Sequence, residues 1–254
     1  MEKLSCRYFM ELAYKGTSYC GWQVQPEERT VQGDLENALS TICREKIAVV
    51  GCGRTDAGVH ASYYVAHFNS AKEGLDAPDF THKLNSFLSK DIALFSIRKV
   101  NNDTHARFDA CQRTYHYHIN IKKNPFTQES SWYYNRKLDV QLMNKACDIL
   151  FEYEDFTSFS KLHTDVKTNN CTIYQAFWEE KNNSLKFTIS ANRFLRNMVR
   201  AIVGTLVEVG EGKLSPDDFR AVIEAKDRGR AGKSVPPQAL FLADIAYPKE
   251  VFEH

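Results

Sequence analysis

The segment from Gly51 to Ala61 is the part of the sequence whose residue types could do chemistry. It places the carboxylate of Asp56 between the guanidinium of Arg54 and the imidazole of His60. Strand-like apolar patterns precede and follow the segment, so we expect the carboxylate on a loop held between two strands. A carboxylate in such a place can act as a nucleophile or stabilise a charged intermediate. A simple turn over residues 55–58 explains the same residues equally well, since Asp and Gly both favour turns.

Two familiar glycine-rich motifs do not fit this segment. The dinucleotide-binding fingerprint needs a glycine where Asp56 stands, and a P-loop needs Gly-Lys-Ser or Gly-Lys-Thr at residues 58–60. Glycoside hydrolysis normally uses a second carboxylic acid, which the segment lacks. A single carboxylate suits a rearrangement from which water is excluded.

A strand pattern at residues 113–119 carries a second group of candidate side chains. Its alternation places Tyr115 and Tyr117 on one face and His116 and His118 on the other. Aromatic residues in such a pattern usually pack in a core, and we assign Tyr117 to packing. Two histidines at this spacing more often form a half-exposed face than a metal site, and no cysteine or further histidine lies at ligand spacing. We therefore expect no metal.

A helix expected to begin at Arg193 carries the third group. On a helical wheel Arg193, Arg196 and Arg200 fall within about a 60° arc, opposite an apolar face. Such a stripe is most often a polar face in contact with water, so it does not by itself indicate a binding site. Farther along the chain, the segment 229–234 combines glycines with polar residues and predicts a mobile loop.

The hydrophobic pattern of the whole chain predicts an α+β fold made of two similar halves, 1–105 and 106–254. Each half reads as a ferredoxin-like βαββαβ unit, with one extra helix in the second and a hairpin around Asn182 and Asn183. Such units form an antiparallel sheet with helices on one face, which leaves a cleft at the seam between the halves for a ligand. The expected helices lie near 31–42, 80–88, 140–150, 194–209 and 216–225.

Composition is typical of a globular protein and excludes few functions. The chain has 254 residues, of which 43% are hydrophobic and 26% charged, enough for one large or two medium domains. Seven cysteines without a Cys-x-x-Cys pair indicate neither a disulfide framework nor a structural zinc site. No apolar run approaches a membrane span and no signal peptide is recognisable, so we expect a cytoplasmic protein. The net charge of +1 means that any surface for nucleic acid must be local.

The eight residues from Gly53 to His60 resemble the signature loop of the bacterial tRNA pseudouridine synthase A family, in which the aspartate is catalytic. Other stretches resemble the family in order and spacing, and the resemblance covers nearly the whole chain. They are Tyr14–Thr17, Gly21–Gln23, His105–Phe108, Asp155–Phe159 and Phe194–Arg200. The chain departs from the family pattern at Cys52, Ala239 and residues 63–64, where no charged residue is involved.

The resemblance implies a catalytic set made of Asp56, Tyr115 and Arg200. Tyr115 would stack on a flipped uracil, and its hydroxyl would take part in proton transfer at C5. Arg200 would pair with Asp56 and hold it ionised in a partly dry cleft. Arg54 would insert near the flipped nucleotide. The substrate-binding residues expected in all are Arg54, His60, Arg193, Arg196 and Phe108.

The resemblance also implies tRNA as the substrate, with uridines at nucleotides 38, 39 and 40 of the anticodon stem-loop converted to pseudouridine. It implies a homodimer that needs no cofactor and no metal. Two other classes stay open at this point. A non-catalytic RNA-binding module could be built from paired βαββαβ units, and a carboxylate-nucleophile hydrolase could act on a small nucleoside. The sequence does not decide which tRNAs are modified or the order of bond breaking.

Overall fold

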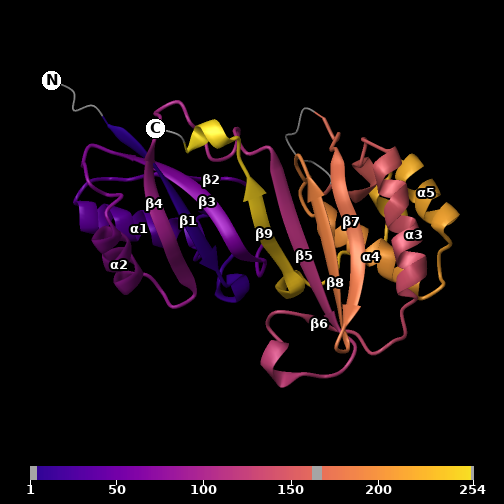
Figure 1. Ribbon diagram of the computed structural model, residues 1–254. Coiled ribbons are helices and arrows are strands. Elements are labelled where there is room, and N and C mark those ends of the chain that lie inside the picture. The colour runs from indigo at the N-terminus through magenta and orange to yellow at the C-terminus, as the bar shows by residue number, and fades with distance from the viewer. Residues whose placement is uncertain (1–4, 162–167, 253–254) are drawn as a thin grey trace. The chain divides into compact units, whose positions relative to one another are not determined.

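The computed structural model describes residues 5–161 and 168–252, which fold into two units (Figure 1). The first unit holds the described residues up to Cys111 and those from Leu242 onward, and the second runs from Gln112 to Phe241. Both contain helices and mainly antiparallel strands, which confirms the predicted α+β class. Within the described residues, no helix is both long and apolar enough to span a bilayer.

The first unit follows the order βαββαβ. Its elements are β1 (Cys6–Tyr14), α1 (Val31–Cys43), β2 (Val49–Gly51), β3 (His60–Ser70), α2 (Pro78–Phe87) and β4 (Ile92–Val100). The strands lie side by side in the order β4, β1, β3, β2, each antiparallel to its neighbours. Both helices lie on one face of this sheet (Figure 1). The catalytic candidate Asp56 therefore falls on the connection between two neighbouring strands, as predicted.

Helix α1 shows how the sequence sets these elements. Thr30 caps it by accepting a hydrogen bond from the Gly33 amide at 3.2 Å. Val31 and Leu35, one turn apart, are buried together with Ala38 and Leu39. The helix ends where Arg44 adopts the left-handed conformation.

The second unit is built around an antiparallel sheet in the order β5, β8, β7. Its elements are β5 (Gln112–Asn120), β6 (Trp132–Tyr133), α3 (Val140–Ile149), β7 (Ile173–Lys181), β8 (Ser184–Ala191), α4 (Met198–Gly210), α5 (Pro216–Glu224) and β9 (Leu240–Ala246), of which β9 continues into the first unit. The predicted hairpin is confirmed: Asn182 and Asn183 both have positive φ and join β7 to β8. Helix α4 is almost entirely buried.

The C-terminal segment belongs with the first unit, whereas the predicted halves placed it in the second. The ring of Phe9 on β1 contacts those of Tyr247 and Phe252, with centroids 5.7 and 6.2 Å away. The Tyr247 hydroxyl also donates to the carbonyl of Ala106 at 2.5 Å. These tertiary contacts join segments more than 140 residues apart, which a reading of local periodicity does not capture.

Both units close the outer edge of a strand with a helix asparagine. Asn85 of α2 donates to the Leu94 carbonyl at 2.9 Å and accepts from its amide at 2.8 Å. Asn144 of α3 pairs in the same way with Trp178 of β7, at 3.1 and 2.7 Å. Each side-chain amide thus takes the place of a neighbouring strand and satisfies backbone groups that an edge would leave unpaired.

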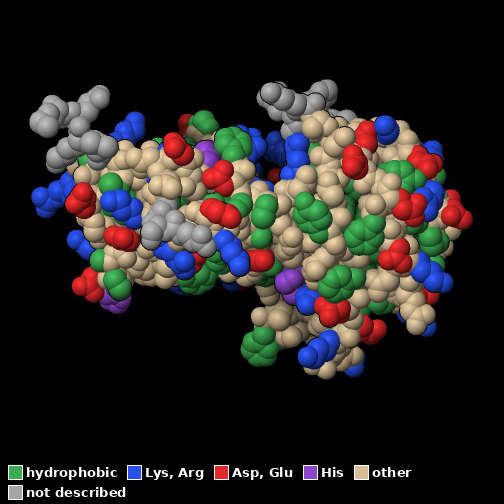
Figure 2. All heavy atoms as spheres, turned by 45° about the horizontal axis from the view of Figure 1, so that its top comes forward, with side chains coloured by type: hydrophobic (Ala, Val, Ile, Leu, Met, Phe, Trp, Pro, Cys, Tyr) green, Lys and Arg blue, Asp and Glu red, His purple; other side chains and the backbone are tan. Residues whose placement is uncertain are grey.

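The surface carries both signs of charge. On the face shown in Figure 2, basic and acidic side chains are interspersed, in keeping with the net charge of +1.

We expect Asn144→Ala to lower the free energy of unfolding by about 1–3 kcal/mol, because it leaves a partly buried amide and carbonyl of Trp178 without partners. Lys145→Ala, at the next position of the same helix, is the matched control and should change stability by less than about 0.5 kcal/mol. Urea unfolding monitored by circular dichroism measures both. Equal stability of the two variants would show that the edge contact contributes nothing.

Candidate active site

The Asp56 loop connects the end of β2 to the start of β3. Asp56 is half-buried, Arg54 is exposed and His60 is only 2% exposed. The Val59 amide donates to the Asp56 carbonyl at 3.1 Å, and Gly58 has a φ of 78°. The predicted turn is therefore present, and it is the turn that carries the carboxylate.

Aromatic residues from neighbouring segments form hydrogen bonds that hold this loop in place. The hydroxyls of Tyr14 and Thr55 are hydrogen-bonded at 2.8 Å, and the Tyr64 hydroxyl donates to the Gly53 carbonyl. Trp22 stacks on Tyr64 with ring centroids 4.1 Å apart. The backbone amide of Trp22 donates to the Thr55 carbonyl at 3.3 Å. The residues on either side of Arg54 are fixed, which prepares the loop before any substrate arrives.

Two glycines let a neighbouring segment press against the loop. A Cβ at Gly16 would lie 2.0 Å from the carbonyl oxygen of Val59, and one at Gly21 would lie 2.4 Å from that of Thr55. The buried His60 accepts the Gly16 amide at Nδ1, at 2.9 Å. His60 thus takes part in building the loop, and the substrate contact expected of it stays a prediction. The sequence had marked both glycine stretches but gave them no role.

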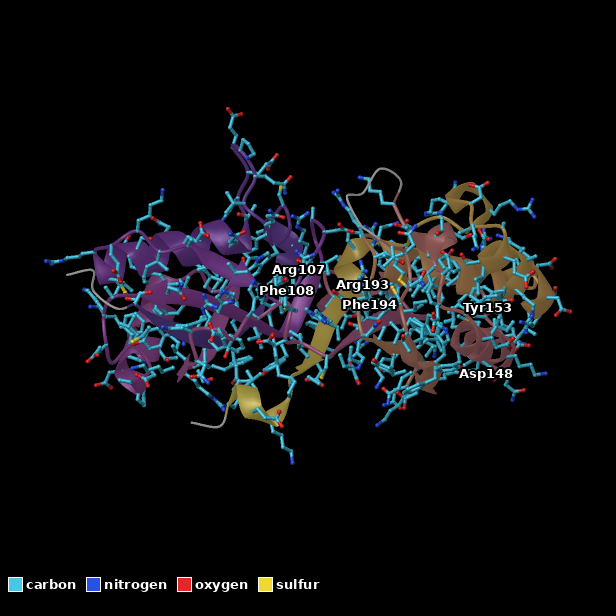
Figure 3. The ribbon with its side chains drawn as sticks, turned by 90° about the horizontal axis from the view of Figure 1, so that it is seen from above. Arg107, Phe108, Asp148, Tyr153, Arg193 and Phe194 are labelled. Carbon is cyan, nitrogen blue, oxygen red and sulfur yellow. The ribbon has the colours of Figure 1, made fainter. Side chains whose placement is uncertain are left out.

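Phe108 lies on a second exposed turn of the first unit (Figure 3). Its side chain is 74% exposed, and the Arg107 guanidinium lies 5.8 Å from its ring centroid. The Phe108 ring rests on that of His105, whose centroid is 4.2 Å away. The Nδ1 atom of His105 accepts the amides of Arg107 and Phe108 at 3.1 and 3.3 Å, a geometry that requires this nitrogen to be unprotonated.

A second histidine, His67, supports His105, and neither was assigned a role from the sequence. The His67 ring lies 4.7 Å from that of His105, and its Nδ1 accepts the Ala106 amide at 3.1 Å. Burial, with smaller effects from Arg7 and His105, lowers the pKa of His67 to about 4. Burial and the Arg7 charge also lower the pKa of His105. Two neutral imidazoles therefore hold the turn that presents Phe108.

In the second unit, Tyr115 lies half-buried near the start of β5. The ring of Phe194 meets it edge to face, with centroids 5.1 Å apart and planes at 89°. Tyr117 is fully buried, its hydroxyl donates to the Pro236 carbonyl at 3.0 Å, and burial raises its pKa. Its predicted packing role is confirmed. The two tyrosines share a face of β5 but differ in exposure.

His116 and His118 lie on the other face of β5, with ring centroids 6.2 Å apart. Burial, with smaller effects from His116 and Lys186, lowers the pKa of His118 to about 4. In residues 5–161 and 168–252, no three His, Cys, Asp or Glu side chains are grouped so as to hold a metal ion.

The predicted arginine stripe is wrong, because α4 begins at Met198 and not at Arg193. Asn197 adopts a left-handed conformation with φ 66° directly before the helix, which breaks the helical repeat. Arg193 (Figure 3) and Arg196 consequently lie in the loop before the helix, and of the three arginines only Arg200 is on it. The Arg196 side chain is exposed, and its carbonyl accepts the Lys161 amide at 3.1 Å.

Arg200 is half-buried in the first turn of α4 and fixed by the segment before β9. Its Nε donates to the Val235 carbonyl at 2.7 Å, and its own carbonyl accepts the Val235 amide at 3.3 Å. The side chains of Asn197 and Ser234 are hydrogen-bonded at 2.6 Å. A Cβ at Gly204 would lie 1.9 Å from the carbonyl oxygen of Lys233. The segment predicted as a mobile loop is instead tied closely to the helix.

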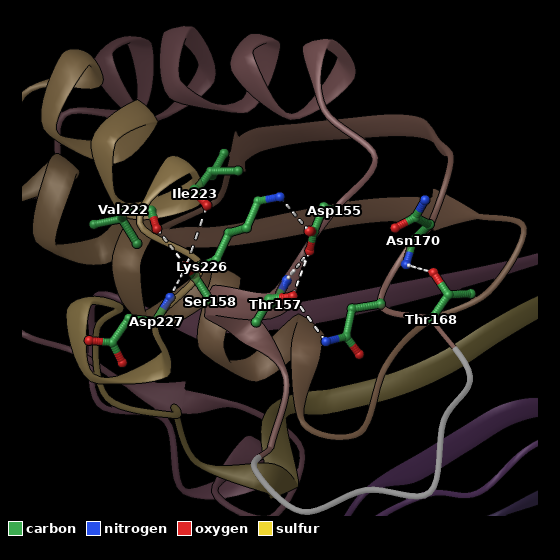
Figure 4. A network of polar contacts seen from close by, with 10 residues as sticks. Asp155, Thr157, Ser158, Thr168, Asn170, Val222, Ile223, Lys226 and Asp227 are labelled. Atoms are coloured by element: carbon green, nitrogen blue, oxygen red, sulfur yellow. Dashed lines mark hydrogen bonds and ion pairs between the residues drawn. The ribbon is translucent and has the colours of Figure 1, made fainter.

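A network of polar contacts gives a structural role to the Asp155–Phe159 stretch (Figure 4). Asp155 accepts the Thr157 hydroxyl at 2.6 Å and pairs with Lys226 at 2.9 Å. The hydrogen bond from Thr157 is the main reason that the pKa of Asp155 is lowered. The buried Ser158 hydroxyl donates to the Val222 carbonyl at 2.6 Å and accepts the Asp227 amide at 3.0 Å. These bonds fix the segment that leads to Lys161, whose amide is hydrogen-bonded to the Arg196 carbonyl.

Comparison of the sequence with known proteins identifies the family to which the chain belongs. A sequence model described as tRNA pseudouridine synthase matches residues 12–109 and 153–248, which include every candidate site residue except Tyr115. The tRNA pseudouridine synthase A of Parabacteroides distasonis is 54% identical over 246 residues, covering 97% of this chain and 98% of that protein. The protein of the same name from Bacteroides fragilis is 54% identical over 248 residues, with 97% and 98% covered. That of Bacillus subtilis is 39% identical over 240 residues, with 93% and 97% covered. The chain belongs to the tRNA pseudouridine synthase A family.

Proposed function

We propose that this member of the family isomerises uridine to pseudouridine in the anticodon stem-loop of tRNA, at nucleotides 38, 39 or 40. The observation that carries the proposal is the Asp56 loop, where one carboxylate is held on a backbone fixed by Tyr14, Trp22 and Tyr64. Family membership supplies the substrate class and the reaction type.

The proposed reaction is an isomerisation in which a positioned carboxylate takes the central part. The bond between the sugar and N1 of uracil breaks, the base rotates, and a bond forms between the same sugar carbon and C5. The proton on C5 is lost and N1 gains one, so the atoms balance without a co-reactant. Asp56 acts as the nucleophile once the base has been flipped out of the stack, and the bond that it forms with the nucleotide breaks again before the product leaves, which restores the carboxylate. The rigid loop keeps the carboxylate in reach throughout the rotation.

Tyr115 and Arg200 are the partners of Asp56 in this proposal. Tyr115 stacks on the flipped uracil and takes part in proton transfer at C5, with its ring orientation set by the edge contact with Phe194. Arg200 supplies positive charge beside the carboxylate. Its hydrogen bond to Val235 supports this role, because a guanidinium anchored through Nε has a fixed direction.

The remaining site residues bind RNA. Arg54 is exposed two residues before Asp56 and suits insertion beside the flipped nucleotide. Phe108 and Arg107 offer an aromatic face and a charge on one turn. Arg193 and Arg196 contact phosphates from their loop. We further propose that the enzyme works as a cytoplasmic homodimer without cofactor, and that both halves derive from ferredoxin-like units, which the strand order of the first unit supports.

Asp56→Asn should abolish pseudouridine formation and leave tRNA affinity within a few-fold of wild type, because the amide keeps the shape but loses the nucleophilic charge. Mapping of pseudouridine in bulk tRNA after incubation identifies both the activity and the modified nucleotides. Residual turnover above about a thousandth of the wild-type rate would rule out this assignment.

Tyr115→Phe should bind tRNA almost normally and turn over slowly, whereas Tyr115→Leu should also weaken binding. Base stacking contributes about 1–3 kcal/mol, and only the leucine variant removes it. Filter-binding affinities and single-turnover rates of the two variants separate the roles of ring and hydroxyl. If both variants bind equally well, the ring serves packing alone.

Arg200→Ala should reduce kcat by an order of magnitude or more with a modest change in KM, since the charge acts on the reacting group. Arg196→Ala should mainly raise KM and reduce the salt dependence of binding, since an exposed loop arginine meets phosphates. Steady-state kinetics at several salt concentrations compare them. A normal kcat with a raised KM in Arg200→Ala would instead assign this side chain to RNA binding.

A further inference from the structure

The connection between β5 and β6, residues 121–131, presents an aromatic ring to solvent. Phe126 is 95% exposed, more than any other large hydrophobic side chain in the described part of the chain. Single exposed hydrophobic residues are common on protein surfaces. The rest of this connection decides what the exposure means.

The connection is held rigidly in place. The side-chain amide of Asn120 donates to the hydroxyls of Thr127 and Ser131 at 2.5 and 2.7 Å. The Ser131 hydroxyl donates to the Thr127 carbonyl at 2.7 Å, and the Phe126 amide donates to the Asn124 side chain at 3.0 Å. A network of polar bonds thus fixes the backbone that carries Phe126, so little backbone entropy is lost when its ring is covered.

The connection that carries the ring also carries two lysines and one glutamate, Glu129, all exposed. Lys122 and Lys123 are exposed and line a hollow of about 220 Å³ together with Asn124, Asn182 and Asn183. Lysines are depleted at the centre of protein interfaces, where aromatic residues gather with other apolar groups. An exposed ring on a connection that also offers ammonium groups to solvent fits a nucleic acid better, because the ring stacks on a base and the lysines meet phosphates.

We propose that Phe126, Lys122 and Lys123 form a second RNA contact, which binds an unpaired base and its phosphates outside the reacting nucleotide. Tyr115 and Asn120 are five residues apart on β5, about 17 Å along an extended strand. The contact therefore takes a different nucleotide from the one stacked on Tyr115. It rests on the proposed function, because the ligand is the tRNA substrate.

The test measures tRNA affinity, kcat and oligomeric state in the full-length protein. Phe126→Ala should weaken binding of full-length tRNA about tenfold and leave kcat at saturating tRNA unchanged. Replacing Lys122 and Lys123 by Gln together should reduce the slope of log affinity against log salt by about 1.5. Phe151→Ala and Lys145→Gln remove an exposed ring and an exposed lysine elsewhere in the same unit and should change neither quantity.

Unchanged tRNA affinity in Phe126→Ala would overturn the proposal. A shift from dimer to monomer in sedimentation would also overturn it and assign the ring to a second copy of the chain. Either failure leaves kcat intact, whereas failure of the proposed function would appear as absent pseudouridine in the wild-type reaction.

Discussion

The proposed reaction puts one constraint on the structure of the site: a single carboxylate must stay in place while a base leaves and returns. The protein satisfies this constraint through contacts to the backbone of the Asp56 loop. Carbonyls of Gly53, Thr55 and Val59 each meet a neighbouring segment, through a hydroxyl, an amide or the bare Cα of a glycine. Such contacts fix the backbone from which the Asp56 side chain projects and so define where that side chain points.

The sequence predicted what depends on local pattern. The loop of Asp56 between two strands, the Asn182–Asn183 hairpin and the packing of Tyr117 all follow from alternation and turn chemistry. The start of α4 was predicted wrongly, because Arg193, Arg196 and Arg200 happen to repeat with a helical period. The left-handed Asn197 interrupts that repeat, and one residue's dihedral angle is invisible to periodicity.

The residues that sequence reasoning missed act through tertiary hydrogen bonds. His67 and His105 lie 38 positions apart, yet together they hold one turn, and their value lies in being neutral acceptors. Likewise, the segment around Ser234 reads as a flexible loop, and only its fit against Gly204 and Arg200 makes it rigid. The sequence shows that a histidine or a glycine is present, but not which segment packs against it. That depends on which residues the fold buries together, and burial also keeps the histidines neutral.

The contact of Phe9 with Tyr247 and Phe252 has a consequence for synthesis on the ribosome. Domains of a nascent chain generally fold in order from the N-terminus. Here the second unit, up to Phe241, has emerged before the segment that completes the first. The first 111 residues are therefore synthesised before the two rings of the C-terminal segment that contact Phe9. The contact of Asn85 with the outer edge of β4 joins residues nine positions apart and needs nothing from the C-terminal segment, so it leaves this edge less open to pairing with another chain.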